Sequence, residues 1–239
     1  MSAPGIALAA HASGRLVRRY KRFLADVELD GGGGRVTAHC PDPGRMDGLA
    51  VPGAWVRLSE SDDRRRKLRH TLEMIRAGRT WVGVHPGRAN AVVRAALEAA
   101  AIPELAGYRE LRAEVAVGTE TRLDFRLADH AQGAPPAWLE VKSATLAEGE
   151  RARFPDSVTE RGRRHCERLA GIAKAGERAV LLFLVQRSDC TSVEPADDVD
   201  PAYGEALRAA HAAGVELLAL GAKVTAHRIR VTGALPVRL

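Results

Sequence analysis

The chain has 239 residues, of which 46 % are hydrophobic. This composition is ordinary for a globular protein with one large or two modest domains, and no apolar run approaches the roughly 18 residues of a membrane span. We therefore expect no membrane association. The three cysteines show no CxxC spacing, which argues against a zinc site or a disulfide framework and indicates a reducing cytoplasm.

The net charge of +6 is concentrated at one end of the chain. Residues 1–80 hold 15 Lys and Arg against 9 Asp and Glu, whereas residues 81–239 hold 21 of each. A basic segment attached to a neutral one is typical of a module that docks on a polyanion. Charge alone leaves open the alternative of a merely solvated basic surface.

Residues 1–14 are predicted to be a disordered tail, because Ile6 to Ala12 is too short for a secretory signal and has no basic residue before it. The alternation from Phe23 to Leu29 predicts a half-buried strand. The glycine run that follows, residues 31–34, is interpreted as a hairpin turn. Further strands are predicted at residues 35–40, 54–59, 68–75 and 81–84. Residues 15–84 are therefore expected to form a small barrel.

The pattern changes after residue 84. Asn90 is predicted to cap a helix through Ala101, and Asp200 with Pro201 to start another that ends at Gly214. The remaining expected elements are strands at residues 111–117, 122–127, 138–142, 179–185 and 215–220, and a helix from Asp156 or Ser157 to Gly176. The unbroken apolar strand 179–185 indicates a central strand covered on both faces, so residues 85–239 are predicted to be an α/β domain with parallel pairing.

Two neighbouring strands carry the candidate chemistry. The period of two places Glu140 and Lys142 on one face of their strand, and antiparallel pairing brings Asp124 opposite Glu140. Opposed carboxylates repel, and Mg²⁺, which binds through one or two carboxylates together with substrate phosphates, would compensate them. Glu114 is a candidate third oxygen ligand, and Lys142 a candidate catalytic cation. The alternative is that Asp124 and Glu140 are ordinary surface partners of Arg122 and Lys142.

Five stretches resemble the sugar fermentation stimulation protein A family, and the resemblance runs from about Leu16 to Leu239. They are RYKRFLADV at 19–27, HCPDPGRM at 39–46, RLDF at 122–125, EVKS at 140–143 and FPDSVTERG at 154–162. This family is similar to a fusion of an N-terminal OB-type barrel, here residues 15–84, with a PD-(D/E)XK nuclease-like mixed sheet flanked by helices, here residues 85–239. The resemblance implies DNA binding and a nuclease-type site at Asp124, Glu140 and Lys142. Asp42 and Ser157 stand where the family commonly has Asn and Ala.

Basic side chains are candidates for contact with phosphates, because guanidinium groups bind phosphate in a bidentate way. Tyr20, Phe23 and Trp55 are the candidate aromatics for base stacking. The candidate cations are Arg15, Arg18, Arg19, Lys21 and Arg22 in one cluster, Arg64, Arg65, Arg66, Lys67 and Arg69 in a second, and Arg45, Arg122 and Arg161 outside both.

Three further residues form a second tier of site candidates: Asn90, Glu160 and His165. For Glu160 and Arg161 the alternative is first-turn capping and solvation, and for His165 a buried structural role. The leading hypothesis is a cytoplasmic nuclease that uses Mg²⁺ or Mn²⁺ and acts on DNA, with RNA as the second option. The alternatives are a non-catalytic DNA-binding regulator of sugar metabolism genes on a nuclease-like scaffold, and an RNA-associated binding module.

Overall fold

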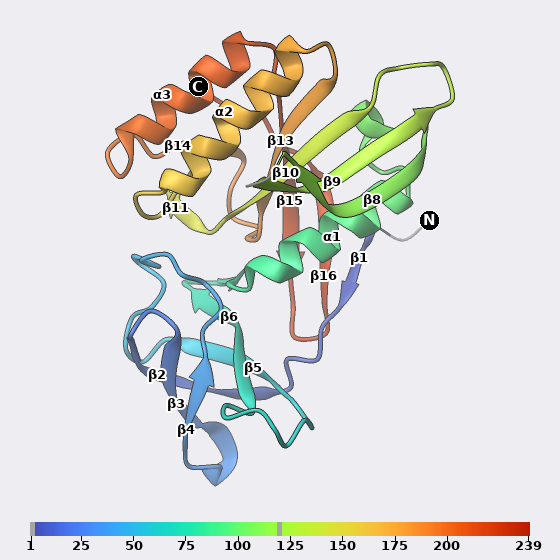
Figure 1. Ribbon diagram of the computed structural model, residues 1–239. Coiled ribbons are helices and arrows are strands. Elements are labelled where there is room, and N and C mark those ends of the chain that lie inside the picture. The colour runs from blue at the N-terminus through green and yellow to red at the C-terminus, as the bar shows by residue number, and fades with distance from the viewer. Residues whose placement is uncertain (1–2, 119–120) are drawn as a thin grey trace.

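The computed structural model describes residues 3–118 and 121–239, which form a β unit and an α/β unit (Figure 1). The β unit is a closed five-stranded barrel with the order β4-β3-β2-β5-β6, and pairing of His39 with Thr71 joins β4 to β6. β7 extends the sheet beside β6. The strands are β2 (Ala12–Tyr20), β3 (Leu24–Leu29), β4 (Arg35–His39), β5 (Trp55–Glu60), β6 (His70–Ala77) and β7 (Thr80–Gly83), with a short 3₁₀ turn at Asp30–Gly32. The predicted barrel is confirmed.

The first residues of the described chain differ from the predicted disordered tail. β1 (Gly5–Ala7) pairs antiparallel with β16 (Arg228–Ala234), at the far end of the sequence. Leu8 and Ala10 are then buried in the core of the α/β unit. A three-residue strand carries almost no periodic signal of its own, and the strand that β1 pairs with, β16, lies more than 200 positions away.

The α/β unit is built on a seven-stranded mixed sheet with the order β1-β16-β15-β13-β10-β9-β8. β13 is its central strand and runs parallel to β10 and β15, which confirms the predicted parallel pairing. The strands are β8 (Tyr108–Val117), β9 (Thr121–His130), β10 (Ala137–Ala144), β13 (Arg178–Val185) and β15 (Glu216–Val224). A 3₁₀ turn at Pro103–Leu105 precedes β8.

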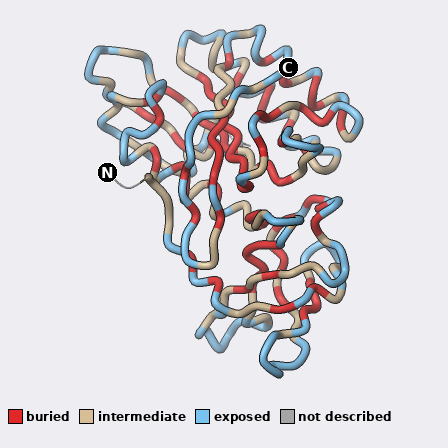
Figure 2. Tube along the Cα trace, turned by 180° about the vertical axis from the view of Figure 1, so that it is seen from behind, coloured by how far each residue is buried: buried red, intermediate tan, exposed pale blue. Residues whose placement is uncertain are grey.

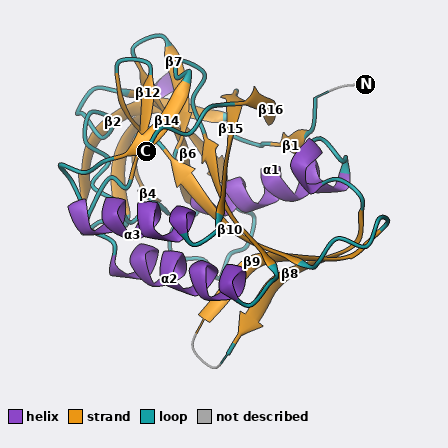
Figure 3. Cartoon of the chain, turned by 90° about the horizontal axis from the view of Figure 1, so that it is seen from above, coloured by secondary structure: helices purple, strands orange, loops and turns teal. Residues whose placement is uncertain are grey.

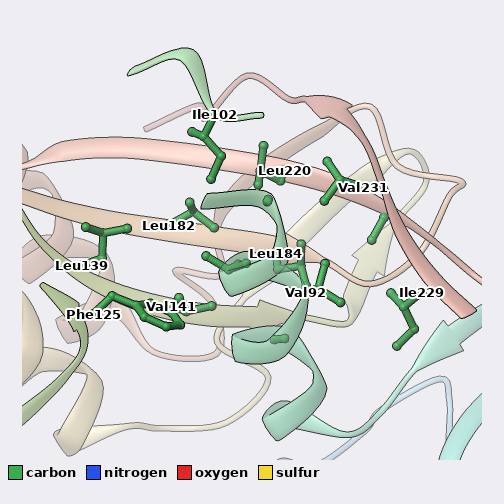
Figure 4. Packing of buried hydrophobic residues seen from close by; sticks show 14 of the residues in the cluster. Val92, Ile102, Phe125, Leu139, Val141, Leu182, Leu184, Leu220, Ile229 and Val231 are labelled. Carbon is green, nitrogen blue, oxygen red and sulfur yellow. The ribbon is translucent and has the colours of Figure 1, made fainter. Parts of the chain in front are cut away.

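Helices cover both faces of this sheet (Figure 3). α1 (Pro86–Glu98) packs on one face, where Val92 meets Leu139, Val141 and Leu182 in one apolar cluster (Figure 4). On the other face, α2 (Glu160–Lys174) and α3 (Pro201–Ala212) cover the alternate residues of β13. The central strand β13 is accordingly buried along nearly its whole length (Figure 2). Among the described residues, no helix is long and apolar enough to cross a membrane.

A second, three-stranded sheet stands beside the carboxyl end of β10. It consists of β11 (Leu146–Glu148), β12 (Arg151–Phe154) and β14 (Ser192–Pro195), in the order β11-β12-β14. β12 leads directly into residues 155–159, which connect this sheet to α2. These elements position that connection next to the barrel.

Two helix starts differ from the prediction. α1 begins at Pro86, in keeping with the preference of proline for a first turn, so Asn90 lies inside the helix and does not cap it. α2 begins at Glu160 with Thr159 as its cap, since the Thr159 hydroxyl accepts a hydrogen bond from the Gly162 N–H at 3.0 Å. The predicted cap at Asp200 of α3 is confirmed, because its carboxylate accepts from the Tyr203 N–H at 3.0 Å.

Candidate active site

A cavity of about 370 Å³ lies between the barrel and the α/β unit. The barrel contributes the loop Pro41–Gly44, and the α/β unit contributes the end of β10, residues 140–143, with the connection 154–157 and the first turn of α2. Two of the three predicted catalytic residues, Glu140 and Lys142, line this cavity. We refer to it as the cleft.

Asp124 is held at the point where β9 and β10 separate. The ladder between these strands ends at the pair Phe125–Leu139, so Asp124 and Glu140 are not directly paired. Instead the Asp124 carboxylate accepts hydrogen bonds from the Val141 N–H at 2.7 Å and from the Asn90 side chain at 2.6 Å. Burial and the nearby charge of Glu140 raise the pKa of Asp124 to about 6, despite these two donors.

One oxygen of Glu140, Oε1, accepts hydrogen bonds from two side chains. The Lys142 Nζ lies 2.7 Å from Oε1, and His165 Nδ1 donates to the same oxygen. Burial alone would raise the pKa of the Glu140 carboxyl, but the hydrogen bond from His165 and the charge of Lys142 lower it. Glu140 therefore carries a negative charge although it is 5 % exposed.

His165 is itself oriented by Arg161. The Arg161 Nε donates to His165 Nε2 at 3.4 Å, one helical turn away on α2. With Nε2 accepting, Nδ1 carries the proton that goes to Glu140, so the partners of the ring determine its tautomer. The three residues form a chain from the rim of the cleft to its buried carboxylate.

The second oxygen of Glu140 is buried and has no hydrogen-bond partner among residues 3–118 and 121–239. A buried carboxylate oxygen without a donor is costly unless a cation neutralises it. The donor set, two carboxylates with an open cleft beside one of them, suits a hard divalent ion, because Mg²⁺ keeps several waters and needs only one or two protein carboxylates. The residues present therefore fit a metal of this class.

Glu114 does not join this site. It occupies an unpaired position in β8 opposite β9, its φ of 53° lies in the left-handed region, and its side chain is exposed. No cluster of three or more His, Cys, Asp or Glu side chains suited to a metal ion occurs within residues 3–118 and 121–239. The predicted third carboxylate ligand is therefore not brought to the site: the register of β8 with β9 continues unbroken around Glu114, from Ala113–Phe125 to Val115–Leu123, but the Glu114 side chain stays on the exposed side of the strand.

A second carboxyl pair, Asp42 and Asp156, joins the barrel to the α/β unit. The Asp42 carboxylate accepts from the Gly44 N–H at 2.8 Å, and Asp156 accepts from the Met46 N–H at 3.1 Å. Burial and the charge of Asp156 raise the pKa of Asp42 to about 6. A Cβ at Gly44 would lie 2.0 Å from an Asp156 oxygen, so only glycine allows this close approach.

The predicted basic residues form two groups: some donate hydrogen bonds to main-chain carbonyls of the fold, and others lie on the surface. Arg19 donates to the carbonyls of Arg22, Asp42, Gly44 and Arg45, and Arg22 donates to the Pro43 carbonyl. Most of the others are exposed arginines engaged by a neighbour: Arg18 with Asp26, Arg45 with Asp47, Arg65 with Asp63, Arg69 with Glu60, Arg66 with Thr71 and Arg15 on the Trp55 ring.

The remaining candidates lie on the surface. Lys21, Arg64, Lys67 and Arg122 are exposed, and Glu160 pairs with Arg164 on the outer side of α2. Arg161 is the member of the predicted basic set that lines the cleft. Glu160 therefore has the solvated role that was the alternative for it.

Sequence reasoning missed several walls of the cleft. Asp42, Gly44 and Asp156 lie within the quoted stretches 39–46 and 154–162, but the first was used only for the family resemblance and the second also as a helix start. The signal was available, since both stretches combine Pro or Gly with an acidic residue. Their pairing was not predictable, because Met46 and Asp156 are 110 positions apart.

Comparison with known proteins agrees with this architecture. The family described as Sugar fermentation stimulation protein RE domain matches residues 87–228, and the SfsA N-terminal OB domain matches residues 17–84. A sugar fermentation stimulation protein homolog of Geobacter sulfurreducens is 48 % identical over 225 residues, covering 94 % of this chain and 95 % of the relative. The homolog of Halorhodospira halophila is 52 % identical over 226 residues, covering 93 % of each.

A solved structure shares the whole fold. The Pyrococcus furiosus SfsA, described as a complex with Ca²⁺, superimposes with a TM-score of 0.90 at 27 % identity and with complete coverage of both chains. The two matched domains, the full-length relatives and this shared architecture place both the barrel and the mixed sheet in one family. The chain belongs to the sugar fermentation stimulation protein (SfsA) family.

Proposed function

We propose that this chain is a divalent-metal-dependent nuclease, with Asp124 and Glu140 as metal ligands and Lys142 as the catalytic cation. The observation that carries the proposal is the second oxygen of Glu140, which is buried and unpartnered beside the cleft. The two donors on the first oxygen keep the carboxylate charged and oriented. A metal ion at this oxygen would supply the partner that a buried charged oxygen ordinarily has.

Mg²⁺ or Mn²⁺ is the proposed cofactor. A divalent ion in this position supplies Lewis-acid stabilisation of the negative charge that develops on a phosphodiester. A structure of the Pyrococcus furiosus relative is described as a complex with Ca²⁺, an ion that also takes oxygen ligands. This description supports a hard-cation site in the family fold.

Lys142 supplies a fixed positive charge at the cleft. Its side chain is 11 % exposed, and its Nζ is held 2.7 Å from Glu140 Oε1. A preorganised ammonium group in a partly water-excluded site stabilises charge that appears only in the transition state. Asn90 and the Val141 N–H hold the Asp124 carboxylate in place, and Arg161 adds a guanidinium at the rim.

Nucleic acid, with DNA first and RNA second, is the proposed substrate, acted on in the cytoplasm. The excess of Lys and Arg in residues 1–80 places positive charge on the barrel that forms one wall of the cleft. The same charge also supports the second candidate, a non-catalytic DNA-binding regulator. That candidate binds without a metal and makes no use of the unpartnered Glu140 oxygen.

Cleavage assays with purified protein separate these two functions. Single- and double-stranded DNA and RNA are incubated with Mg²⁺, Mn²⁺, Ca²⁺ or EDTA, for the wild type and for Asp124→Asn and Lys142→Ala. We expect cleavage with Mg²⁺ or Mn²⁺ and none in EDTA. Each substitution should lower the rate by roughly 10²–10³-fold, the usual effect of losing one transition-state contact.

Glu114→Gln is the matched control, because Glu114 is a carboxylate of the neighbouring strand that lies outside the site. Its rate should stay within about twofold of the wild type. Binding of nucleic acid that is independent of metal, with no cleavage by the wild type under any condition, would contradict the nuclease proposal and support the regulator.

A further inference from the structure

A second cavity continues the cleft along the barrel. It has a volume of about 490 Å³ and is lined by Arg19, Arg22, Arg45, Asp47 and Val158. It meets the cleft at three shared lining residues, Pro43, Gly44 and Ser157. We call this second cavity the arginine groove.

The arginine groove keeps a positive charge. Arg19 and Arg22 donate only to main-chain carbonyls, which are neutral, and within the described part of the chain neither guanidinium forms an ion pair. Arg45 is offset by Asp47 at 3.0 Å. Arg19 uses its guanidinium N–H groups on four carbonyls of the fold, and its charge acts on the buried Asp42 carboxyl. The exposed Arg22 is therefore the arginine of this groove whose charge remains available to a phosphate.

The turn between β2 and β3 is strained and basic. Lys21 and Arg22 have φ of 48° and 63°, in the left-handed region that side chains other than glycine rarely adopt. Contacts from Arg19 to the Arg22 carbonyl, and from Arg22 to Pro43, hold the turn in this conformation. Strain of this kind persists where surrounding contacts impose it, and it concentrates at ligand sites.

Phe23 follows Arg22 directly and is 47 % exposed. Of the three candidate stacking aromatics, Tyr20 is covered by the Arg18 guanidinium and Trp55 by that of Arg15, at 4.6 and 3.5 Å from the ring centroids. The ring of Phe23 has no such cover among the described residues. Its backbone is fixed, because its carbonyl accepts from the Cys40 N–H at 2.8 Å.

We propose that the arginine groove and Phe23 bind an unpaired polynucleotide strand as it leaves the cleft, with a phosphate on Arg22 and a base on the Phe23 ring. An exposed aromatic next to an arginine without an ion pair is the arrangement by which single strands are held without sequence preference. This proposal rests on the proposed function for the class of substrate, a nucleic acid. It adds that the strand bound in the groove is unpaired.

Binding is measured by fluorescence anisotropy with labelled oligo-dT of twelve nucleotides and a duplex of equal length, in EDTA so that no strand is cleaved. Phe23→Ala should weaken binding of the single strand by at least about fivefold, the effect of one lost stacking contact. Phe23→Trp should restore it and Phe23→Leu should not. Duplex affinity should change by less than about twofold.

Arg22→Ala tests the phosphate contact. It should weaken oligo-dT binding and lower the slope of log affinity against log salt by about 0.7, the value for one phosphate of a single strand. The matched control is Arg76→Ala, because Arg76 is an exposed barrel arginine that also donates to one carbonyl, that of Gly78. Its affinity and slope should equal those of the wild type.

Equal losses for single strand and duplex, or oligo-dT binding unchanged in Phe23→Ala and Arg22→Ala, would overturn the proposal. An oligo-rU arm shows whether RNA occupies the same groove, since Phe23→Ala must weaken both strands if it does. If the wild type binds through Phe23 but cleaves no nucleic acid, the nuclease proposal is contradicted and the strand-binding proposal stands. If the protein is a nuclease whose binding does not depend on Phe23, only the strand-binding proposal is contradicted.

Discussion

Two pairs of carboxyl groups lie at the cleft, Asp124 with Glu140 and Asp42 with Asp156; Asp124 stands behind its wall and the other three line it, and the two pairs are compensated in different ways. Burial is the largest influence on both Asp124 and Asp42, and it contributes to a pKa of about 6 in each. The two pairs nevertheless differ in whether a carboxylate oxygen remains available to bind a cation. The comparison separates a part of the cleft suited to chemistry from a part that holds the two units together.

Main-chain amides compensate the Asp42–Asp156 pair. The Gly44 and Met46 N–H groups belong to the barrel loop, and a ligand can replace them only by moving that loop. The Lys142 ammonium and the His165 N–H compensate Glu140 instead, and within the described residues they leave one of its oxygens without a donor. The Glu140 pair is thus open to an incoming cation, whereas the Asp156 pair is closed by its own backbone.

Removing the charge of Glu140 should have the largest effect, and this effect is on the affinity for divalent cations. Glu140→Gln should lower affinity for Ca²⁺ and Mn²⁺ by roughly 100-fold, about 2.7 kcal/mol, because one of two charged ligands is lost. Asp156→Asn should leave the affinity within about threefold. Isothermal titration calorimetry with Ca²⁺ measures both, and equal losses in the two variants would show that the two pairs do not differ in kind.

Asp42→Asn should change how the free energy of unfolding depends on pH, which tests the second carboxyl pair. The Asp42 carboxyl has a pKa of about 6 in the folded chain and 3.8 when unperturbed, so the folded state holds its proton more tightly. The stability that this proton contributes is present below pH 4 and is lost as the pH rises through 6. Asparagine keeps the acceptor for the Gly44 N–H and has no charge to bury. It should therefore stabilise the fold by up to roughly 3 kcal/mol above pH 7 and not at pH 4.

Urea unfolding at pH 4, 6 and 8 measures this dependence. Asp47→Asn is the control, because Asp47 is an exposed carboxylate of the same loop that pairs with Arg45. Its free energy of unfolding should differ from that of the wild type by less than about 1 kcal/mol at each pH. A constant difference between Asp42→Asn and the wild type from pH 4 to 8 would contradict the assigned cause.

Gly44→Ala should weaken the contact between the two units. The added Cβ would overlap the Asp156 carboxylate, which must rotate and lose its bond to the Met46 N–H. We expect a loss of about 1–3 kcal/mol in the free energy of unfolding, typical of overpacking. Gly171→Ala in α2 is a matched change with nothing within 4 Å, and it should stabilise by up to about 1 kcal/mol. Thermal unfolding distinguishes the two signs.

The part of the site that sequence reasoning predicted lies on neighbouring strands. Asp124, Glu140 and Lys142 were identified because strand alternation and antiparallel pairing are local rules, and the structure brings them to one end of β10. The same rules did not place Glu114 correctly, since β8 keeps its register with β9 on both sides of Glu114 while its side chain remains exposed. Alternation and register assign a residue to a strand face, but they do not determine which side chains of that face converge on one site.

The rest depends on contacts between distant segments. His165 reaches Glu140 only because α2 packs on the sheet in one particular rotation, and Asp156 meets Met46 across 110 positions. The pairing of β1 with β16 is the same kind of contact at the level of the fold. Neither hydrophobic periodicity nor capping signals contain this information, because both describe a segment without its neighbours.

Arg161→Ala should have the smallest effect, and it tests whether the chain from Arg161 through His165 to Glu140 orients the metal ligand. Arg161 is exposed, and its bond to His165 Nε2 is long at 3.4 Å, so its loss leaves the imidazole in place but less strictly oriented. Changes beyond the direct ligands usually cost up to 10–100-fold in metal affinity, and a long exposed bond should cost about two- to fivefold. Arg164→Ala removes a guanidinium of the same helix that pairs only with Glu160, so its Ca²⁺ affinity should equal that of the wild type. If both variants lose affinity alike, the effect comes from the general charge of α2 and not from the orientation of His165.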